Sequence, residues 1–283
     1  MLESTLHRGL HVYCNETYSP SQDRGLSITP NLLNSIPEVR LRRYRTCASA
    51  QNVDVEKLYR WNSQVALTIF DDLGALEIAM RSAMSNELLS TFGPKWFENP
   101  FLFDDSSTDL IKGAIKHGDK SSYQPSTPEE RLGKLVADLM FGFWVQILSK
   151  GSFQSVKDSI TGKITSKSRM IYDELLWKPA LHKAFPGVGK FERATVQRAA
   201  HDLQFARNRV AHHENVIWGI PAYGQTEANG KTERRMSISE IHLTLIQLAG
   251  YINQDLADWI TTNSALPSVL ASCPLPDQSV LKI

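Results

Sequence analysis

The sequence is poor in cysteine and lacks any long apolar run. Only three of its 283 residues are cysteines, and no two of them form a CxxC pair. This pattern predicts neither a disulfide framework nor a zinc knuckle, and it favours a reducing compartment. No stretch of about 18 apolar residues occurs, which argues against a membrane span. An early acid, Glu3, without a following apolar run leads us to expect no signal peptide and a cytoplasmic location.

Neither sign of charge dominates the chain, whose formal net charge is +1 at pH 7. A uniformly basic nucleic-acid-binding protein is therefore excluded, and any anion site must come from local clustering. Residues 151–213 contain six lysines and five arginines against three aspartates and two glutamates. This local excess suits an anion site in that part of the fold.

Apolar residues at helical spacing predict an all-α fold, a single-domain helical bundle. The clearest element is a long spine helix over residues 54–91, capped at its start by Asp54 and stopped by Gly93-Pro94. We expect an N-terminal arm over residues 1–29, a domain over 30–263 and a frayed tail over 264–283.

The other expected elements follow from capping boxes, turn residues and apolar periodicity. They are helices over 38–50 and 106–117, two helical runs separated by Gly142, an exposed loop over 149–168, a short helix over 170–185, a helix from about 190 to 210, a mobile loop that could hold a small hairpin within 215–236, and a last helix over 237–260.

The residues best suited to chemistry lie at the end of the helix that begins near residue 190. Metal-free RNA cleavage needs a base for the 2′-hydroxyl, an acid for the leaving 5′-oxygen and a cation for the phosphorane. His212 can carry protons near neutral pH, Arg207 can hold phosphate oxygens, and the Asn208 amide can bond a phosphate or orient its neighbours. Five residues on an ideal helix turn through about 140°, so Arg207 and His212 converge only on a frayed last turn or across a symmetric dimer.

The string from Arg207 to Glu214 closely resembles the "RNxxAHH" block of the Abi-like, abortive-infection proteins, and Arg207 and His212 match the R-x4-6-H signature of the HEPN superfamily. Upstream, residues 76–81 resemble the family's "lEvalR" block, residues 59–62 its "Y-x-x-N" entry and Arg42-x-Tyr44 its "RLxxY" opening. The sequence departs from the usual block at 214–218.

The resemblance implies a homodimeric, metal-independent endoribonuclease toxin of phage defence, restrained by an antitoxin RNA or protein. Its RNA would be cut by Arg207 and His212, with Asn208 shaping the site. No metal and no cofactor are implied, although His213 next to Glu214 could by itself suggest a ligand pair.

Several further residues are candidates for supporting roles in RNA binding. Glu77 and Arg81 could form a helix-face pair, or a buried Glu77 could brace Arg207. The arginines around Tyr44 could track an RNA backbone or be a solvated face. The supporting set is Arg209, His213, Glu77, Arg81, Arg42 and Arg43.

Two other classes of function remain open on the sequence. One is a catalytically silent HEPN-like module that binds RNA or a partner and signals infection. The other is a nucleotide-binding scaffold that works beside a nucleotidyltransferase.

Overall fold

A computed structural model describes residues 32–120, 125–158, 160–161, 163–226 and 233–283. The expected N-terminal arm over 1–29 therefore lies outside the described residues. Within them the chain is mostly helical, with two small antiparallel sheets, so the expected helical fold is confirmed.

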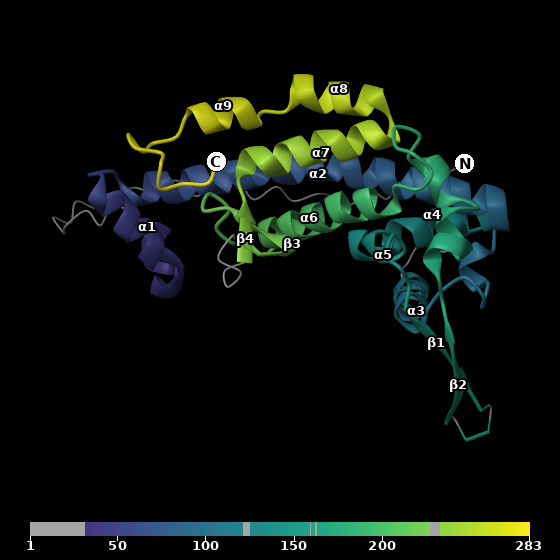
Figure 1. The fold of residues 1–283 in the computed structure, drawn as a ribbon. Coiled ribbons are helices and arrows are strands. Elements are labelled where there is room, and N and C mark those ends of the chain that lie inside the picture. Colours follow the sequence, from purple (N-terminus) through teal and green to yellow (C-terminus); the bar gives the residue numbers. More distant parts are fainter. Residues whose placement is uncertain (1–31, 121–124, 159, 162, 227–232) are drawn as a thin grey trace, which may run out of the picture.

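The elements follow one another in the order that Figure 1 labels. They are η1 (Leu32–Ser35), α1 (Glu38–Ala50), α2 (Val55–Phe92), η2 (Trp96–Glu98), α3 (Asp105–Asp119), α4 (Pro128–Asp138), α5 (Phe141–Gln146), β1 (Phe153–Lys157), β2 (Ile164–Arg169), η3 (Asp173–Trp177), η4 (Leu181–Ala184), α6 (Arg193–Ala211), β3 (Ile220–Thr226), β4 (Glu233–Met236), α7 (Ile238–Ile252), α8 (Gln254–Asn263) and α9 (Leu266–Ala271).

Helix α2 is the expected spine. The Asp54 carboxylate accepts a hydrogen bond from the Lys57 amide at 3.0 Å, and Gly93 ends the helix with a φ of 83° that glycine adopts without steric strain. Its 38 residues correspond to about 57 Å of helix. One face is buried at intervals of three or four residues, through Leu58, Trp61, Val65, Ile69, Leu73, Leu76, Met80, Met84 and Leu88.

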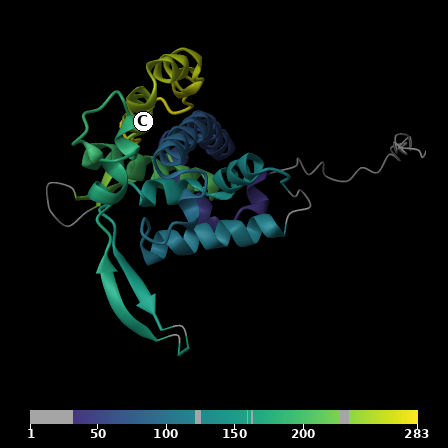
Figure 2. The same cartoon turned by 90° about the vertical axis from the view of Figure 1, so that its right-hand side faces the viewer.

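The other helices pack around α2. Helices α6 and α7 run along it, α8 packs on α7 and α9 on α2 itself, α1 lies at one end, and α3, α4 and α5 gather at the other (Figure 1). The β1–β2 hairpin projects away from this helical body in both views (Figures 1 and 2).

Four expected elements are wrong in form. The break between the two helical runs falls at Leu139 and Met140 rather than at Gly142, which lies inside α5. The stretch 149–168 is not a loop but contains β1 and part of β2, and 170–185 holds a π-helical turn and a 3-10 turn rather than a regular helix. The last helix is two helices, because Asn253 leaves helical geometry and caps α8 with its side chain. The capping box of α7, formed by Ser237 and Glu240, is present as expected.

The C-terminal segment is also not frayed. Helix α9 lies against α2, and Leu266, Leu275 and Leu281 are buried in the common core. The amide of Lys282 donates to the carbonyl of Ile217 at 3.0 Å, and the Lys282 carbonyl accepts from Ile238 at 2.9 Å. These bonds tie the last residues to the chain that follows α6.

The expected mobile loop after α6 is only partly described. Residues 216–222 are buried rather than exposed, and β3 pairs with β4 in the expected hairpin. The connection over 227–232 lies outside the described residues.

Candidate active site at the end of helix α6

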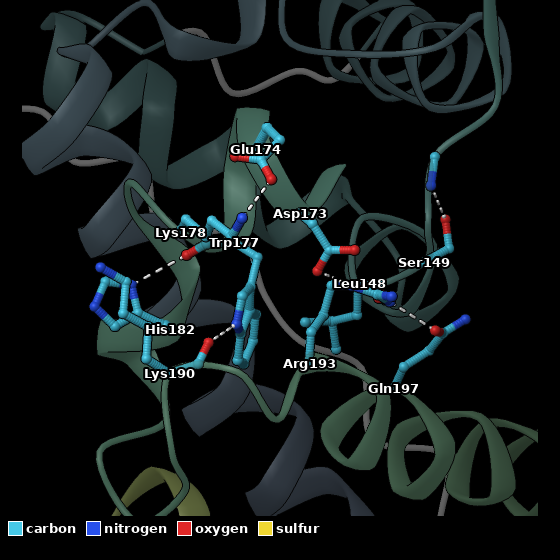
Figure 3. Close-up of polar contacts among 11 residues, drawn as sticks. Leu148, Ser149, Asp173, Glu174, Trp177, Lys178, His182, Lys190, Arg193 and Gln197 are labelled. Atoms are coloured by element: carbon cyan, nitrogen blue, oxygen red, sulfur yellow. Dashed lines mark hydrogen bonds and ion pairs between the residues drawn. The ribbon is translucent and has the colours of Figure 1, made fainter. Parts of the chain in front are cut away.

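Helix α6 is anchored at its start by Arg193, which is 5% exposed. The Arg193 Nε forms an ion pair with the Asp173 carboxylate at 2.7 Å, and Nη1 donates to the Leu148 carbonyl at 2.6 Å and to Gln197 Oε1 at 2.8 Å. Figure 3 shows this side chain directed among the three partners. A buried cation needs such a complete set of acceptors. The bonds fix where α6 starts and hence where its other end lies.

The end of α6 is a tight chain reversal centred on His213. The Glu214 amide donates to the Arg209 carbonyl at 2.9 Å, and the His213 amide donates to the Val210 carbonyl at 3.0 Å. These are the two bonds of a Schellman motif. The residue at its turning point is usually glycine, but here His213 adopts a φ of 53°. An L-residue in this region is strained, and such strain gathers at functional sites.

Arg207 is held against the spine helix. Its Nε lies 3.9 Å from the Glu77 carboxylate, and the two side chains are 30% and 20% exposed. The same Nε is buried and donates to no hydrogen-bond acceptor among the described residues. The expected brace between Glu77 and Arg207 is therefore present as a charge contact.

The neighbouring Arg209 is paired differently. Its Nη2 lies 2.9 Å from the Glu214 carboxylate, within the same turn. Glu214 thereby neutralises one charge of the motif. Arg81, in contrast, forms no ion pair with Glu77 or with any other part of the described chain. The expected helix-face pair of Glu77 and Arg81 does not form.

Asn208 and His212 lie on the exposed side of α6. They are four residues apart, which places them within about 40° of each other around the helix. The helix stays regular to Ala211, and His212 is its C-cap, with its amide still bonded to the Asn208 carbonyl at 3.0 Å. The separation of about 140° between Arg207 and His212 therefore persists, and one chain does not bring both to a single face.

Helix α1 adds positive charge beside this turn. Arg40 Nη1 donates to the His213 carbonyl at 3.3 Å, and the Arg43 guanidinium lies 4.4 Å from the centre of the Trp218 ring. Tyr44 contacts the same ring edge-on, with centroids 4.8 Å apart. Burial raises the pKa of Tyr44 and lowers that of Arg43. Arg42 is exposed. The arginines around Tyr44 are thus a solvated face next to the motif, and Arg43 is also a packing residue.

Asn62 is a positioning residue that reasoning from side-chain chemistry missed. It is buried on α2, and its Oδ1 accepts hydrogen bonds from the amides of Val216 at 2.9 Å and Ile217 at 3.4 Å. It thereby fixes the chain just beyond the motif. Its signal in the sequence is the "Y-x-x-N" block over 59–62.

The end of α6 can bind an anion only through its cationic side chains, and not through the helix backbone. The carbonyl end of a helix carries a partial negative charge, so a phosphate at this end needs cations to offset it. Arg207 and Arg40 can supply that charge. Over the described ranges, no group of three or more His, Cys, Asp or Glu side chains is placed to hold a metal ion, and no helix is long and apolar enough to cross a membrane.

Comparison with known families agrees with the residues gathered here. The chain matches the family described as Abi-like protein over residues 39–218, which run from α1 through the end of α6 to Trp218. The chain therefore belongs to the Abi-like protein family. A comparison with curated proteins finds no match, and a comparison with solved structures also finds none.

Proposed function

We propose that this protein is a metal-independent endoribonuclease of the HEPN type, acting as an abortive-infection toxin in phage defence. The strongest support for this proposal is the conformation and surroundings of the Arg207–His212 turn. It is strained, faces solvent on the His212 side, is braced by Glu77 and is bordered by the arginines of α1. An antitoxin RNA or protein would restrain the activity.

The chemistry follows from the side chains that the turn presents. The 2′-oxygen of a nucleotide attacks the adjacent phosphorus while a base takes its proton. The bond to the 5′-oxygen breaks, and an acid returns a proton to that leaving oxygen. The products are a 2′,3′-cyclic phosphate and a 5′-hydroxyl. His212 serves the proton transfers, Arg207 stabilises the phosphorane charge, and Asn208, on the same side as His212, bonds the phosphate.

A second copy of the chain would complete this site. In one copy Arg207 and His212 point about 140° apart, whereas cleavage needs an acid and a base on opposite sides of one phosphate. A twofold axis beside the end of α6 would place two histidines and two arginines around one cleft. Homodimerisation is thus part of the proposed mechanism.

An apolar stripe on the spine helix suits such a partner. Leu67, Phe70 and Ile78 are 67%, 46% and 56% exposed, and a side chain at Gly74 between them would meet nothing within 4 Å. Phe70 points within about 20° of Glu77 around α2, so the stripe borders the Glu77–Arg207 contact. Leu67→Asp with Ile78→Asp should lower the dimer fraction in sedimentation. A matched pair of substitutions at the exposed Gln64 and Ser82 should not.

The function is tested by incubating purified protein with total RNA in EDTA. Cleavage by the wild type should persist, and His212→Ala and Arg207→Ala should each remove it while the melting temperature stays unchanged. His213→Ala should do less. Activity that vanishes in EDTA and returns with Mg²⁺ would refute the mechanism. If His213→Ala is the inactive variant and His212→Ala is active, the assignment of residues is wrong.

A further inference from the structure

The β1–β2 hairpin has no role in the proposed active site. Its strands pair antiparallel, with Phe153 opposite Arg169 and Ser155 opposite Lys167. Side chains directly opposite each other share one face of a two-stranded ribbon. One face of the hairpin therefore carries Phe153, Lys167 and Arg169. The other carries Gln154, Val156, Ser166 and Ser168, with no charge among them.

The hairpin is firmly attached at its base. Gln154 Nε2 donates to the carbonyls of Pro100 and, at 2.9 Å, Phe103, and the Ser155 amide donates to the Asp105 carboxylate at 3.0 Å. Gly151 begins the hairpin with a φ of 75°, and a Cβ there would lie 2.2 Å from the Met170 carbonyl. Gln154 and Ser155 thus tie the base of β1 to the start of α3, whereas every side chain of β2, including Lys167 and Arg169, is exposed.

The charge of the hairpin is mostly positive. Residues 150–169 contain five basic residues and one acid. That acid, Asp158, is engaged in the turn, where it accepts bonds from the Thr161 amide at 2.6 Å and the Thr161 hydroxyl at 2.8 Å. In the described part of the chain, Lys167 and Arg169 have no carboxylate partner, and the Arg169 guanidinium lies 5.2 Å from the centre of the Phe153 ring.

This face has the features of a single-stranded nucleic-acid contact. Lys167 and Arg169 are two residues apart on one strand, about 6.7 Å, which is close to twice the roughly 3.4 Å per nucleotide of a stacked strand. Phe153 is 48% exposed and stands beside Arg169, as in sites where bases stack on aromatic rings next to cations. The core of an interface for a folded protein is usually depleted of lysine.

The hairpin lies at the opposite end of α6 from the motif. Its first strand begins five residues after Leu148, whose carbonyl is bonded to Arg193 at the start of α6. The 19 residues of α6 span about 28 Å. A stacked strand covers that distance with on the order of eight nucleotides.

We propose that the face of Phe153, Lys167 and Arg169 is a second RNA contact, which holds the backbone of a substrate about one α6 length from the Arg207–His212 turn. The proposal rests on the proposed function for the identity of the ligand. It adds a substrate class, namely RNA with a single-stranded segment longer than about eight nucleotides.

The test measures binding of fluorescent RNA whose 2′-hydroxyls are methylated, so that attack by the 2′-oxygen is blocked and binding is separated from cleavage. A 20-mer and a 6-mer are titrated at several salt concentrations. The variant is Lys167→Ala with Arg169→Ala. The matched control is Lys112→Ala with Lys116→Ala, which removes the same charge from the exposed side of α3.

The hairpin variant should bind the 20-mer roughly tenfold more weakly than the wild type. Its slope of log affinity against log salt should be shallower by about 1.4, which corresponds to two lost phosphate contacts. The 6-mer should change less than twofold, and the control should resemble the wild type. If loss of the Arg169–Phe153 contact unfolds the variant, Lys167→Ala alone makes the test, with a slope shallower by about 0.7 for one lost phosphate contact.

Equal binding of the 20-mer by variant and wild type, equal losses for both oligomers, or no RNA binding by the wild type would overturn the proposal. So would a variant that keeps RNA binding but loses binding of polyglutamate, because the hairpin would then be a surface for acidic proteins. The two proposals fail separately. A protein that binds RNA through the hairpin but cleaves none refutes only the nuclease, and one that cleaves with a neutral hairpin refutes only the second contact.

Discussion

Replacement of Asn62 tests whether the spine helix positions the end of the candidate site. In Asn62→Ala the amides of Val216 and Ile217 both lose their acceptor while remaining buried. An unsatisfied buried donor costs about 1–3 kcal/mol. The bond of 2.9 Å should account for most of this and the bond of 3.4 Å for less. We therefore expect the free energy of unfolding to fall by about 2–4 kcal/mol.

The assay is urea unfolding, together with the melting temperature, which should drop by roughly 2–4 °C per kcal/mol for a chain of this size. Gln64→Ala, at an exposed position two residues away on α2, is the control and should stay within about 0.5 kcal/mol of the wild type. Below the unfolding transition, RNA cleavage by Asn62→Ala should also fall, because the turn that carries His212 loses its support. A loss of stability below 1 kcal/mol, or full cleavage by the variant, would refute this role.

Three further predictions follow from the same region and its neighbours. His213→Gly should raise the free energy of unfolding by about 1 kcal/mol in urea titrations, because glycine relieves the positive φ; a lower stability than that of His213→Ala would contradict the strain. Burial lowers the pKa of His201 and, against the pull of Asp72 at 3.7 Å, that of His242. Because these pKa values are lowered in the folded state, the histidines bind protons more readily in the unfolded chain. The free energy of unfolding should therefore be highest above about pH 6.5 and should fall as the pH drops toward the pKa values of the folded state. Unfolding at pH 7.5 and 5.5 measures this, and His242→Gln should reduce the loss. Glu77→Gln should lower RNA cleavage by loosening Arg207 while leaving the melting temperature within a few degrees, and an unchanged cleavage rate would show that the contact at 3.9 Å does not position Arg207.

The long helices could be predicted because periodicity, caps and stops agreed. The spine was expected over 54–91 and is found over Val55–Phe92, since its apolar residues keep helical spacing between Asp54 and Gly93. The β1–β2 hairpin had no such signal. All described side chains of β2 are exposed, so neither alternation nor an apolar run marks it. The C-terminal segment was misjudged because its prolines suggested fraying, whereas a few buried leucines hold it to the core.

The residues of the candidate site could be predicted from the sequence, but the contacts that position them could not. Family-like blocks pointed to Arg207, His212 and Glu77. The contacts that support them join residues far apart in the sequence, such as Arg40 with His213 and Asn62 with Val216. Backbone carbonyls and amides supply half of each contact, and these groups are the same at every residue. A sequence block marks Asn62 itself, but no sequence pattern identifies the backbone group that it contacts.

The central claim is that RNA is cut by attack of its own 2′-oxygen at the Arg207–His212 turn. It is tested most directly with an end-labelled RNA in EDTA, after its main cleavage position has been mapped and a second RNA has been made with a single 2′-deoxy nucleotide there. The account predicts that the wild type cuts the first RNA to a 2′,3′-cyclic phosphate and a 5′-hydroxyl, leaves the deoxy position intact, and that His212→Ala cuts neither. Cleavage at the deoxy position, or products that end in a 3′-hydroxyl and a 5′-phosphate, would contradict it.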